Sequence, residues 1–173
     1  MGYRIIYLVG FMGCGKSTAG KKLAGILGWQ FLDLDSIIEK KYSLKIEEIF
    51  ILSGEKTFRE YESDTLRSLD LKGDTIISVG GGAPCFGDNM TYMKQTGKVI
   101  YIRMTPAQLK ERLVADNKPR PLIAGLDTDQ LEKFIEIKLS EREIFYLRAG
   151  EIIDGFGLDI NDLALRVQKL FSK

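Results

Sequence analysis

RIIYLVGFMGCGKS, residues 4–17, is an apolar run that leads directly into a glycine-rich loop. Residues 10–17 match the whole G-x-x-x-x-G-K-[ST] pattern of a phosphate-binding loop. The run before the loop predicts a buried strand, and residues 16–27 predict a helix. A plain strand–helix connector would also tolerate glycines, but it needs neither Lys16 nor Ser17. The stretch therefore predicts a strand, a phosphate-binding loop and a helix at the start of an α/β fold.

The predicted loop has a defined chemistry. Its consecutive backbone N–H groups and the positive end of the following helix hold anionic oxygens. Lys16 would reach the β- and γ-phosphates, and the Ser17 hydroxyl would complete a Mg²⁺ shell. ATP with Mg²⁺ is therefore the predicted ligand. The nucleotide-binding residues expected in this segment are Gly13, Cys14, Gly15, Lys16, Ser17 and Thr18.

The remaining chain alternates apolar strands with helices. Further strands are predicted at residues 29–32, 75–79, 98–102 and 151–153, and further helices at 105–115, about 130–147 and 159–171. Continuous apolar strands of this kind favour a parallel sheet that is covered on both faces. Residues 36–69 are mostly helical and form an insertion between strands, whereas residues 116–129 are typical of a surface flap.

Composition excludes several classes of function. The 173 residues are 45% hydrophobic and 28% charged, with a net charge of +1, which gives no electrostatic basis for binding nucleic acid or an anionic membrane. No apolar stretch reaches transmembrane length. Two cysteines do not make a disulfide framework, so we expect a cytoplasmic protein. The chain has no histidine, so acid–base chemistry falls to carboxylates or a lysine.

Asp33 and Asp35 follow the second predicted strand. In an extended segment, residues two apart face the same side, which would turn both carboxylates toward the phosphate loop. One carboxylate would then lie near Mg²⁺ and the other near an acceptor hydroxyl. The alternative interpretation makes Asp35 the cap of a helix that starts at Ser36, and Asp33 a solvated turn residue.

Three arginines and a glycine run complete the set of candidates. Arg59 and Arg142 lie in predicted helices, where a surface ion pair is the ordinary use of such a residue. Arg120 stands between two prolines in the flap and either contacts a transferring phosphate or is a solvated loop charge. Gly80–Gly82 at a strand end would let a ligand approach the backbone closely, or would form only a flexible turn.

Together these motifs resemble the shikimate kinase family. The matching elements are the loop at residues 10–17, Asp33-x-Asp35, Phe58-Arg59-x-x-Glu62, Gly80-Gly81-Gly82, Arg120-Pro121-Leu122 and Arg142 with Tyr146 four residues later. The likeness covers nearly the whole chain. It implies a three-layer α/β/α P-loop NTPase fold like that of nucleoside-monophosphate kinases, with a five-stranded parallel sheet. It also implies a single domain of residues 1–173, with a substrate-binding insertion at about 33–62 and a lid at about 112–126.

The resemblance also implies roles for the site residues. The family transfers the γ-phosphate of ATP to the 3-hydroxyl of shikimate, in the route to chorismate and the aromatic amino acids. In this sequence Ser17 and Asp33 would position Mg²⁺, and Asp35 would take the hydroxyl proton. The shikimate contacts implied by the resemblance are Asp35, Arg59, Gly80, Gly81, Gly82 and Arg142. Those implied for the nucleotide include Lys16, Arg112 near the adenine and Arg120 on the phosphates. A monomer is expected.

Other readings differ in what the site accepts. A gluconate kinase would share the loop and sheet, but the Asp33-x-Asp35 and Phe58–Glu62 elements are harder to explain there. A nucleoside-monophosphate kinase would need a base-recognition pocket, which the sequence does not reveal. A non-catalytic ATP-binding module would have no need of Lys16, Ser17, both aspartates and the arginines.

Overall fold

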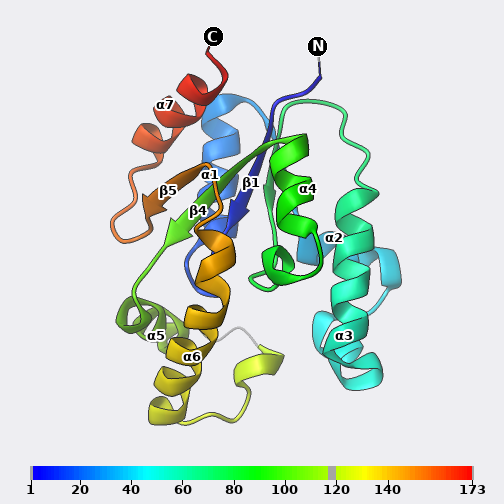
Figure 1. The fold of residues 1–173 in the computed structure, drawn as a ribbon, viewed down its shortest axis with the longest axis vertical. Helices are drawn as coiled ribbons and strands as arrows, with labels where there is room; N and C mark the ends of the chain where they lie inside the picture. The colour runs from blue at the N-terminus through cyan, green and yellow to red at the C-terminus, as the bar shows by residue number, and fades with distance from the viewer. Residues whose placement is uncertain (1, 117–119, 173) are drawn as a thin grey trace.

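The computed structural model describes residues 2–116 and 120–172, and it contains one parallel sheet. Its five strands follow the order β2-β3-β1-β4-β5. The strands are β1 (Ile5–Val9), β2 (Gln30–Asp33), β3 (Thr75–Ser78), β4 (Lys98–Arg103) and β5 (Glu151–Asp154). This confirms the predicted five-stranded parallel sheet, whose carboxyl ends all point toward the lower half of Figure 1.

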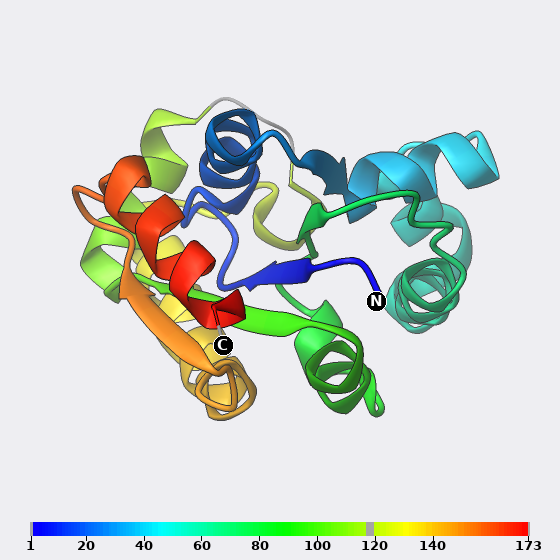
Figure 2. The same ribbon diagram turned by 90° about the horizontal axis from the view of Figure 1, so that it is seen from above.

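Helices cover the sheet on both faces. The long helices are α1 (Lys16–Leu27), α2 (Leu34–Tyr42), α3 (Ile46–Arg67), α4 (Asn89–Thr96), α5 (Pro106–Ala115), α6 (Thr128–Tyr146) and α7 (Ile160–Phe171). Two 3₁₀ turns, η1 (Ala83–Cys85) and η2 (Pro121–Ile123), complete the elements. Figure 2 shows α1 and α7 on one face and α4 and α6 on the other, which is the predicted three-layer arrangement.

The centre of the sheet is buried because its strands are continuously apolar. Ile6–Val9 of β1 and residues 99–102 of β4 are buried, as is all of β3. A strand that is covered on both faces needs apolar residues at every position. The sequences of these strands therefore do not alternate between apolar and polar residues. The structure adds α4, which the sequence did not predict. This helix has few apolar positions: Met90 and Met93 are buried, and Tyr92 is partly buried against the core.

The helical insertion after β2 consists of α2 and α3, which pack against each other beyond β2 at the edge of the sheet. Within α3 the backbone breaks at Gly54, which has φ 79° and ψ 170°. This conformation is practically restricted to glycine, so Gly54 divides α3 into a short first part and a straight second part. The second part carries Arg59 and Glu62 toward the carboxyl ends of the strands.

The opposite, amino-terminal end of the sheet is closed by aromatic packing. The Trp29 ring meets the ring of Phe171 edge-on, with 5.8 Å between centroids. The guanidinium carbon of Arg4 lies 4.7 Å from the centre of the Trp29 ring, and Arg4 also pairs with Asp74. These contacts fasten the end of α7 to the first strands of the sheet. Across residues 2–116 and 120–172, no helix has the length and apolar character that a bilayer crossing requires.

Candidate active site

A cavity of about 860 Å³ opens at the carboxyl ends of the strands. In a parallel sheet this is the position where ligands bind. The predicted residues that line it are Gly13, Gly15, Lys16, Ser17, Thr18, Asp33, Asp35, Arg59, Gly80, Gly81, Gly82, Arg120 and Arg142. The Cys14 side chain is buried, and neither Cys14 nor Arg112 lines the cavity. Segments far apart in sequence therefore meet as the motifs predicted.

The phosphate-binding loop owes its shape to glycine. Gly13 and Gly15 have φ angles of 82° and 92°, a conformation that other residues rarely adopt. Lys16 is 8% exposed, and its Nζ donates to the carbonyl oxygens of Gly10 at 2.7 Å and Phe11 at 2.9 Å. The loop carbonyls thus hold the Lys16 ammonium group close to the backbone N–H groups of the same loop. This arrangement creates a concentrated positive site beneath the cavity.

Asp33 and Asp35 both reach the cavity, but not for the reason that the sequence suggested. Helix α2 begins at Leu34, so the segment is not extended beyond Asp33. Asp33 ends β2 and caps α2 by accepting from the backbone N–H of Ser36 at 3.3 Å. Asp35 lies in the first helical turn, so the interpretation of Asp35 as the cap was wrong. The strand-to-helix junction, rather than two-residue alternation, brings both carboxylates to the site.

Asp35 has an environment suited to a proton acceptor. Its Oδ1 atom is inaccessible to solvent and has no hydrogen-bond partner among the described residues. Burial, with the neighbouring Asp33 carboxylate, raises the pKa of Asp35 to about 6, although Lys16 and Arg59 act in the opposite direction. A carboxylate with a raised pKa and an unpaired oxygen can take a proton from a bound hydroxyl near neutral pH.

Arg59 is a buried cation rather than a surface one. It is 8% exposed, and its Nη1 donates to Oε2 of Glu62 at 2.6 Å. Its Nη2 donates to Glu55 at 3.3 Å. The guanidinium lies directly beside Gly82, where a Cβ atom would come within 2.3 Å of Cζ of Arg59. The absence of a side chain at Gly82 is therefore what lets Arg59 enter the cavity.

Glu62 is fully buried and lies close to Asp35. A Cβ at Gly80 would be 2.1 Å from Oε1 of Glu62 and 3.3 Å from Oδ1 of Asp35, so both oxygens surround this glycine. Burial raises the pKa of Glu62 to about 7, and the Asp35 carboxylate adds to this rise, whereas the ion pair with Arg59 opposes it. Its Oε1 has no hydrogen-bond partner in the described part of the chain. Two buried carboxyl groups thus lie beside Gly80, Asp35 lining the cavity and Glu62 behind its wall.

Arg142 enters the cavity from α6 on the other side of the glycine run. It is 8% exposed, and its guanidinium carbon lies 5.6 Å from the centre of the Phe11 ring. A Cβ at Gly81 would lie 3.6 Å from its Nη1 atom. One helical turn later the Tyr146 hydroxyl donates to the carbonyl oxygen of Gly81. We call the set of Asp35, Arg59, Glu62, Gly80–Gly82 and Arg142 the acceptor pocket.

Arg120 and Arg112 occupy different places. Nη2 of Arg120 donates to Asp116 at 2.7 Å, while its buried Nη1 atom has no partner among the residues described. Arg112 instead donates to the carbonyl oxygens of Cys14 and Gly155, each at 3.1 Å. It therefore ties the phosphate loop to the segment after β5. The predicted flap and lid also include residues 117–119, which lie outside the described residues.

The donor set fits a nucleotide-bound Mg²⁺ better than a protein-only metal centre. No cluster of three acidic, cysteine or histidine ligands occurs within the described ranges. The Ser17 hydroxyl donates to Oδ2 of Asp33 at 2.6 Å, so two oxygens lie side by side at the mouth of the loop. Mg²⁺ commonly takes one or two protein oxygens and completes its shell with phosphate and water.

Glu62 belongs to the Phe58-Arg59-x-x-Glu62 motif, but no role was predicted for it. Its position three residues after Arg59 was the available signal, because residues at that spacing share one face of a helix. Ser78, which shares a hydrogen bond with Ser17 at 3.1 Å, and Phe50 also line the cavity and were missed. Neither residue stands in a pattern that would reveal it before the fold is known.

Comparison with known proteins gives one consistent family. A family model described as Shikimate kinase matches residues 12–161. A shikimate kinase from Parabacteroides distasonis is 37% identical over 169 residues, covering 95% of this chain and 98% of that protein.

Solved structures agree with this likeness. The shikimate kinase from Bacteroides thetaiotaomicron superposes with a TM-score of 0.89 at 38% identity, covering 96% of this chain and 97% of that one. The enzyme from Acinetobacter baumannii in complex with shikimate gives 0.84 at 33% identity, covering 97% and 92%. A gluconokinase from Sinorhizobium meliloti, at 12% identity and a TM-score of 0.58, shares the fold alone.

Proposed function

This chain belongs to the shikimate kinase family, and on that premise we propose how its own residues carry out the reaction. It transfers the γ-phosphoryl group of ATP to the 3-hydroxyl of shikimate, giving shikimate 3-phosphate and ADP on the route to chorismate and the aromatic amino acids. One observation supports the assignment of roles most strongly. The phosphate loop shares a single cavity with Asp35, Arg59 and Arg142.

The donor side holds the triphosphate. The backbone N–H groups of Gly13, Gly15 and Thr18 bind phosphate oxygens, with the positive end of α1 behind them. The N–H of Cys14 joins them by exchanging its bond to the Phe11 carbonyl for phosphate. Lys16 exchanges its contacts with two loop carbonyls for the β- and γ-phosphates. Arg120 offers to the transferring group its Nη1 atom, which has no hydrogen-bond partner in the described part of the chain. Both cations offset the charge that develops in the transition state. Arg112, anchored to the loop, packs beside the adenine.

Ser17 and Asp33 would hold Mg²⁺ next to this loop, Asp33 through water. The adjacent oxygens of these two residues support the assignment. The ion neutralises charge on the phosphate oxygens that it binds. Its removal by a chelator should abolish turnover.

The acceptor pocket holds shikimate. Arg59 and Arg142 grip the carboxylate with their planar guanidinium groups, and Gly80–Gly82 let the ring approach the backbone. Asp35 accepts the hydrogen bond of the 3-hydroxyl. The hydroxyl oxygen forms a bond to the γ-phosphorus while the bond to the β-phosphate oxygen breaks, and its electron pair leaves with ADP. The hydroxyl proton moves to Asp35, whose raised pKa suits this task.

The single domain works with a substrate-binding insertion at about residues 33–62 and a lid at about 112–126. Within the described part of the lid, Leu122 and Ile123 are only partly buried, which fits low local stability. A bound phosphate would give Arg120 a second anionic partner. Hydrogen exchange over residues 120–126 should therefore slow when ADP and shikimate are both bound. We further propose that the enzyme acts as a cytoplasmic monomer, with no nucleic-acid or membrane partner.

A substrate panel tests the proposed function. Purified protein with ATP and Mg²⁺ is supplied with shikimate, gluconate or nucleoside monophosphates, and release of ADP is followed. We expect ADP release with shikimate that is stoichiometric with shikimate 3-phosphate. Faster turnover of gluconate or of a nucleotide would overturn the acceptor assignment, and absence of turnover with every acceptor would favour a non-catalytic ATP-binding module.

A further inference from the structure

A buried polar cluster lies behind the acceptor pocket. Asn89, the first residue of α4, is fully buried, and its Nδ2 donates to the carbonyl oxygen of Ala83 at 3.0 Å. Its Oδ1 accepts from the Ser63 hydroxyl at 2.9 Å and also from Nη1 of Arg67. Arg67 in turn pairs with Asp88. We call Ser63, Arg67, Asp88 and Asn89 the Asn89 cluster.

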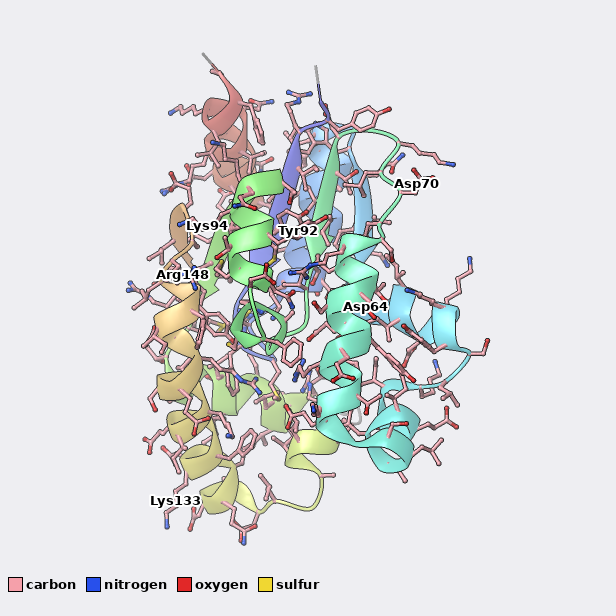
Figure 3. The ribbon with its side chains drawn as sticks, turned by 45° about the vertical axis from the view of Figure 1, so that its right-hand side comes forward. Asp64, Asp70, Tyr92, Lys94, Lys133 and Arg148 are labelled. Atoms are coloured by element: carbon pink, nitrogen blue, oxygen red, sulfur yellow. The ribbon has the colours of Figure 1, made fainter. Side chains whose placement is uncertain are left out.

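The cluster joins two separate parts of the acceptor pocket. Ser63 and Arg67 belong to α3, and they lie one and two turns beyond Arg59 on that helix. Ala83 comes directly after the glycine run Gly80–Gly82. Figure 3 shows the two helices that the cluster bridges, with Asp64 labelled on α3 and Tyr92 on α4. The guanidinium carbon of Arg67 lies 4.9 Å from the centre of the Tyr92 ring, which adds a second contact between these helices.

The chemistry of the cluster requires an amide at its centre. A carboxamide can donate to one carbonyl while it accepts from two other groups. An aspartate would place its charge against the Ala83 carbonyl, and an apolar residue would leave buried donors and acceptors unpaired. Asn89 therefore supplies a two-sided link that few other side chains can replace.

A small displacement of the glycine run would move the guanidinium group of Arg59. Its guanidinium is so close to Gly82 that even a single added carbon would overlap it. On the other side of the run, the Tyr146 hydroxyl ties Gly81 to α6, the helix that carries Arg142. Both arginine-bearing helices are thus fastened to this segment, α6 by Tyr146 to Gly81 and α3 by the Asn89 cluster to Ala83, directly after the run. Together the two links set the separation of the two guanidinium groups.

We propose that Asn89 and Arg67 are positioning residues for the shikimate carboxylate, acting through α3 and the glycine run without touching the substrate. This inference rests on the proposed roles of Arg59 and Arg142. The cluster lies away from the phosphate loop, so its loss should weaken shikimate binding and leave nucleotide binding intact.

Steady-state kinetics of Asn89→Ala and Arg67→Met test the proposal. We expect the KM for shikimate to rise roughly tenfold in each variant, the size of one lost buried hydrogen bond. The KM for ATP should stay within about twofold. Arg67→Lys, which keeps a donor and the charge, should recover part of the loss. Arg166→Met is the matched control, because it breaks an exposed ion pair with Asp162 on α7.

A double variant separates positioning from general stability. If Asn89 and Arg67 act as one unit, combining Asn89→Ala with Arg67→Met should raise the KM for shikimate little more than either change alone. Ser63→Ala provides a milder change should Asn89→Ala fold poorly. Equal rises in both KM values, or unchanged shikimate KM in folded variants, would overturn the inference. Failure of the wild-type protein to phosphorylate shikimate would instead overturn the proposed function.

Discussion

The phosphate loop and the acceptor pocket face the same cavity but present different chemical groups to it. The loop is a run of consecutive residues whose glycines turn backbone N–H groups inward. The acceptor pocket draws charged side chains from α2, α3 and α6 onto a glycine run at the end of β3. The loop would bind its ligand mainly with fixed backbone dipoles, helped by Lys16, and the acceptor pocket with buried charged side chains.

This difference has energetic consequences. Backbone donors carry no net charge and do not titrate, so apart from Lys16 the loop depends mainly on its shape. Buried ions are costly unless they are paired, and the Arg59–Glu62 pair together with Asp35 makes the acceptor pocket sensitive to single substitutions and to protons. A substitution in the phosphate loop should therefore leave shikimate binding intact, and one in the acceptor pocket should leave ATP binding intact.

The largest effect should come from the donor half. Lys16→Ala removes a cation from the transferring phosphoryl group, so we expect kcat to fall by at least about a hundredfold. The fold should persist, because the hydrogen bonds of Lys16 are all to the loop, and shikimate alone should still bind through Arg59 and Arg142. Lys22→Ala, on the exposed face of α1, is the control. Turnover near the wild-type value in Lys16→Ala would show that Lys16 does not stabilise the transferring phosphoryl group.

The aspartates lie at the boundary between the halves and should divide between them. Asp35→Asn should lower kcat by about a hundredfold, since it removes the proton acceptor, with little change in Mg²⁺ requirement. Asp33→Asn should move the Mg²⁺ titration of activity to higher concentration, because its oxygen lies beside Ser17. Superimposable Mg²⁺ titrations of the two variants would contradict this division.

A smaller effect should separate the halves by ligand. Arg59→Lys and Arg142→Lys keep the charge but lose the planar fork, so calorimetry should show roughly tenfold weaker shikimate binding. ATP affinity should be unchanged in both. Arg166→Lys, on the exposed face of α7, controls for the loss of a guanidinium elsewhere. Unaltered shikimate affinity in both variants would return these arginines to a purely structural role.

The smallest effect should be a several-fold dependence on pH that is confined to the acceptor pocket. The pKa values of Asp35 and Glu62 are raised to about 6 and about 7. As the pH falls through this range the carboxylates take up protons, so kcat/KM for shikimate should decrease. The apparent pKa values of the profile belong to the pair.

Stability should move in the opposite direction with pH. The folded chain binds these protons more tightly than the unfolded chain, whose carboxyls titrate near pH ~4. The free energy of unfolding should therefore fall as the pH rises from about 4 to about 7. Glu62→Gln should flatten this dependence, whereas Glu136→Gln on the surface of α6 should not. A dependence unchanged in Glu62→Gln would show that this carboxyl does not titrate there.

Local patterns predicted most of the fold and the donor half. The loop is contiguous, and the central strands are apolar enough to be recognised as buried, so neither depends on contacts between distant segments. Helix α4 was missed because it buries few apolar residues and is tied to α3 by Asn89, whose partner Ser63 lies 26 residues earlier in the chain. Its stability comes from tertiary contacts, which leave no helical repeat of apolar residues in the local sequence.

The acceptor pocket was predicted residue by residue only through the resemblance. From the sequence alone, Arg59 and Arg142 were indistinguishable from surface cations, because burial depends on what packs above them. Asp35 was expected at the site for a mistaken geometric reason, since the start of α2 at Leu34 was not apparent. The role of Glu62 needed the fold as well, because its pKa depends on Gly80 and Asp35 lying beside it.

The position of Trp29 makes its fluorescence sensitive to one end of the molecule only. It is the chain's one tryptophan, and it lies between Arg4 and Phe171 at the end of the sheet opposite the cavity. Its fluorescence should report the detachment of α7 and global unfolding while remaining nearly silent when shikimate or nucleotide binds. A ligand titration followed by this signal would look like an absence of binding, so substrate occupancy has to be followed by calorimetry or by turnover.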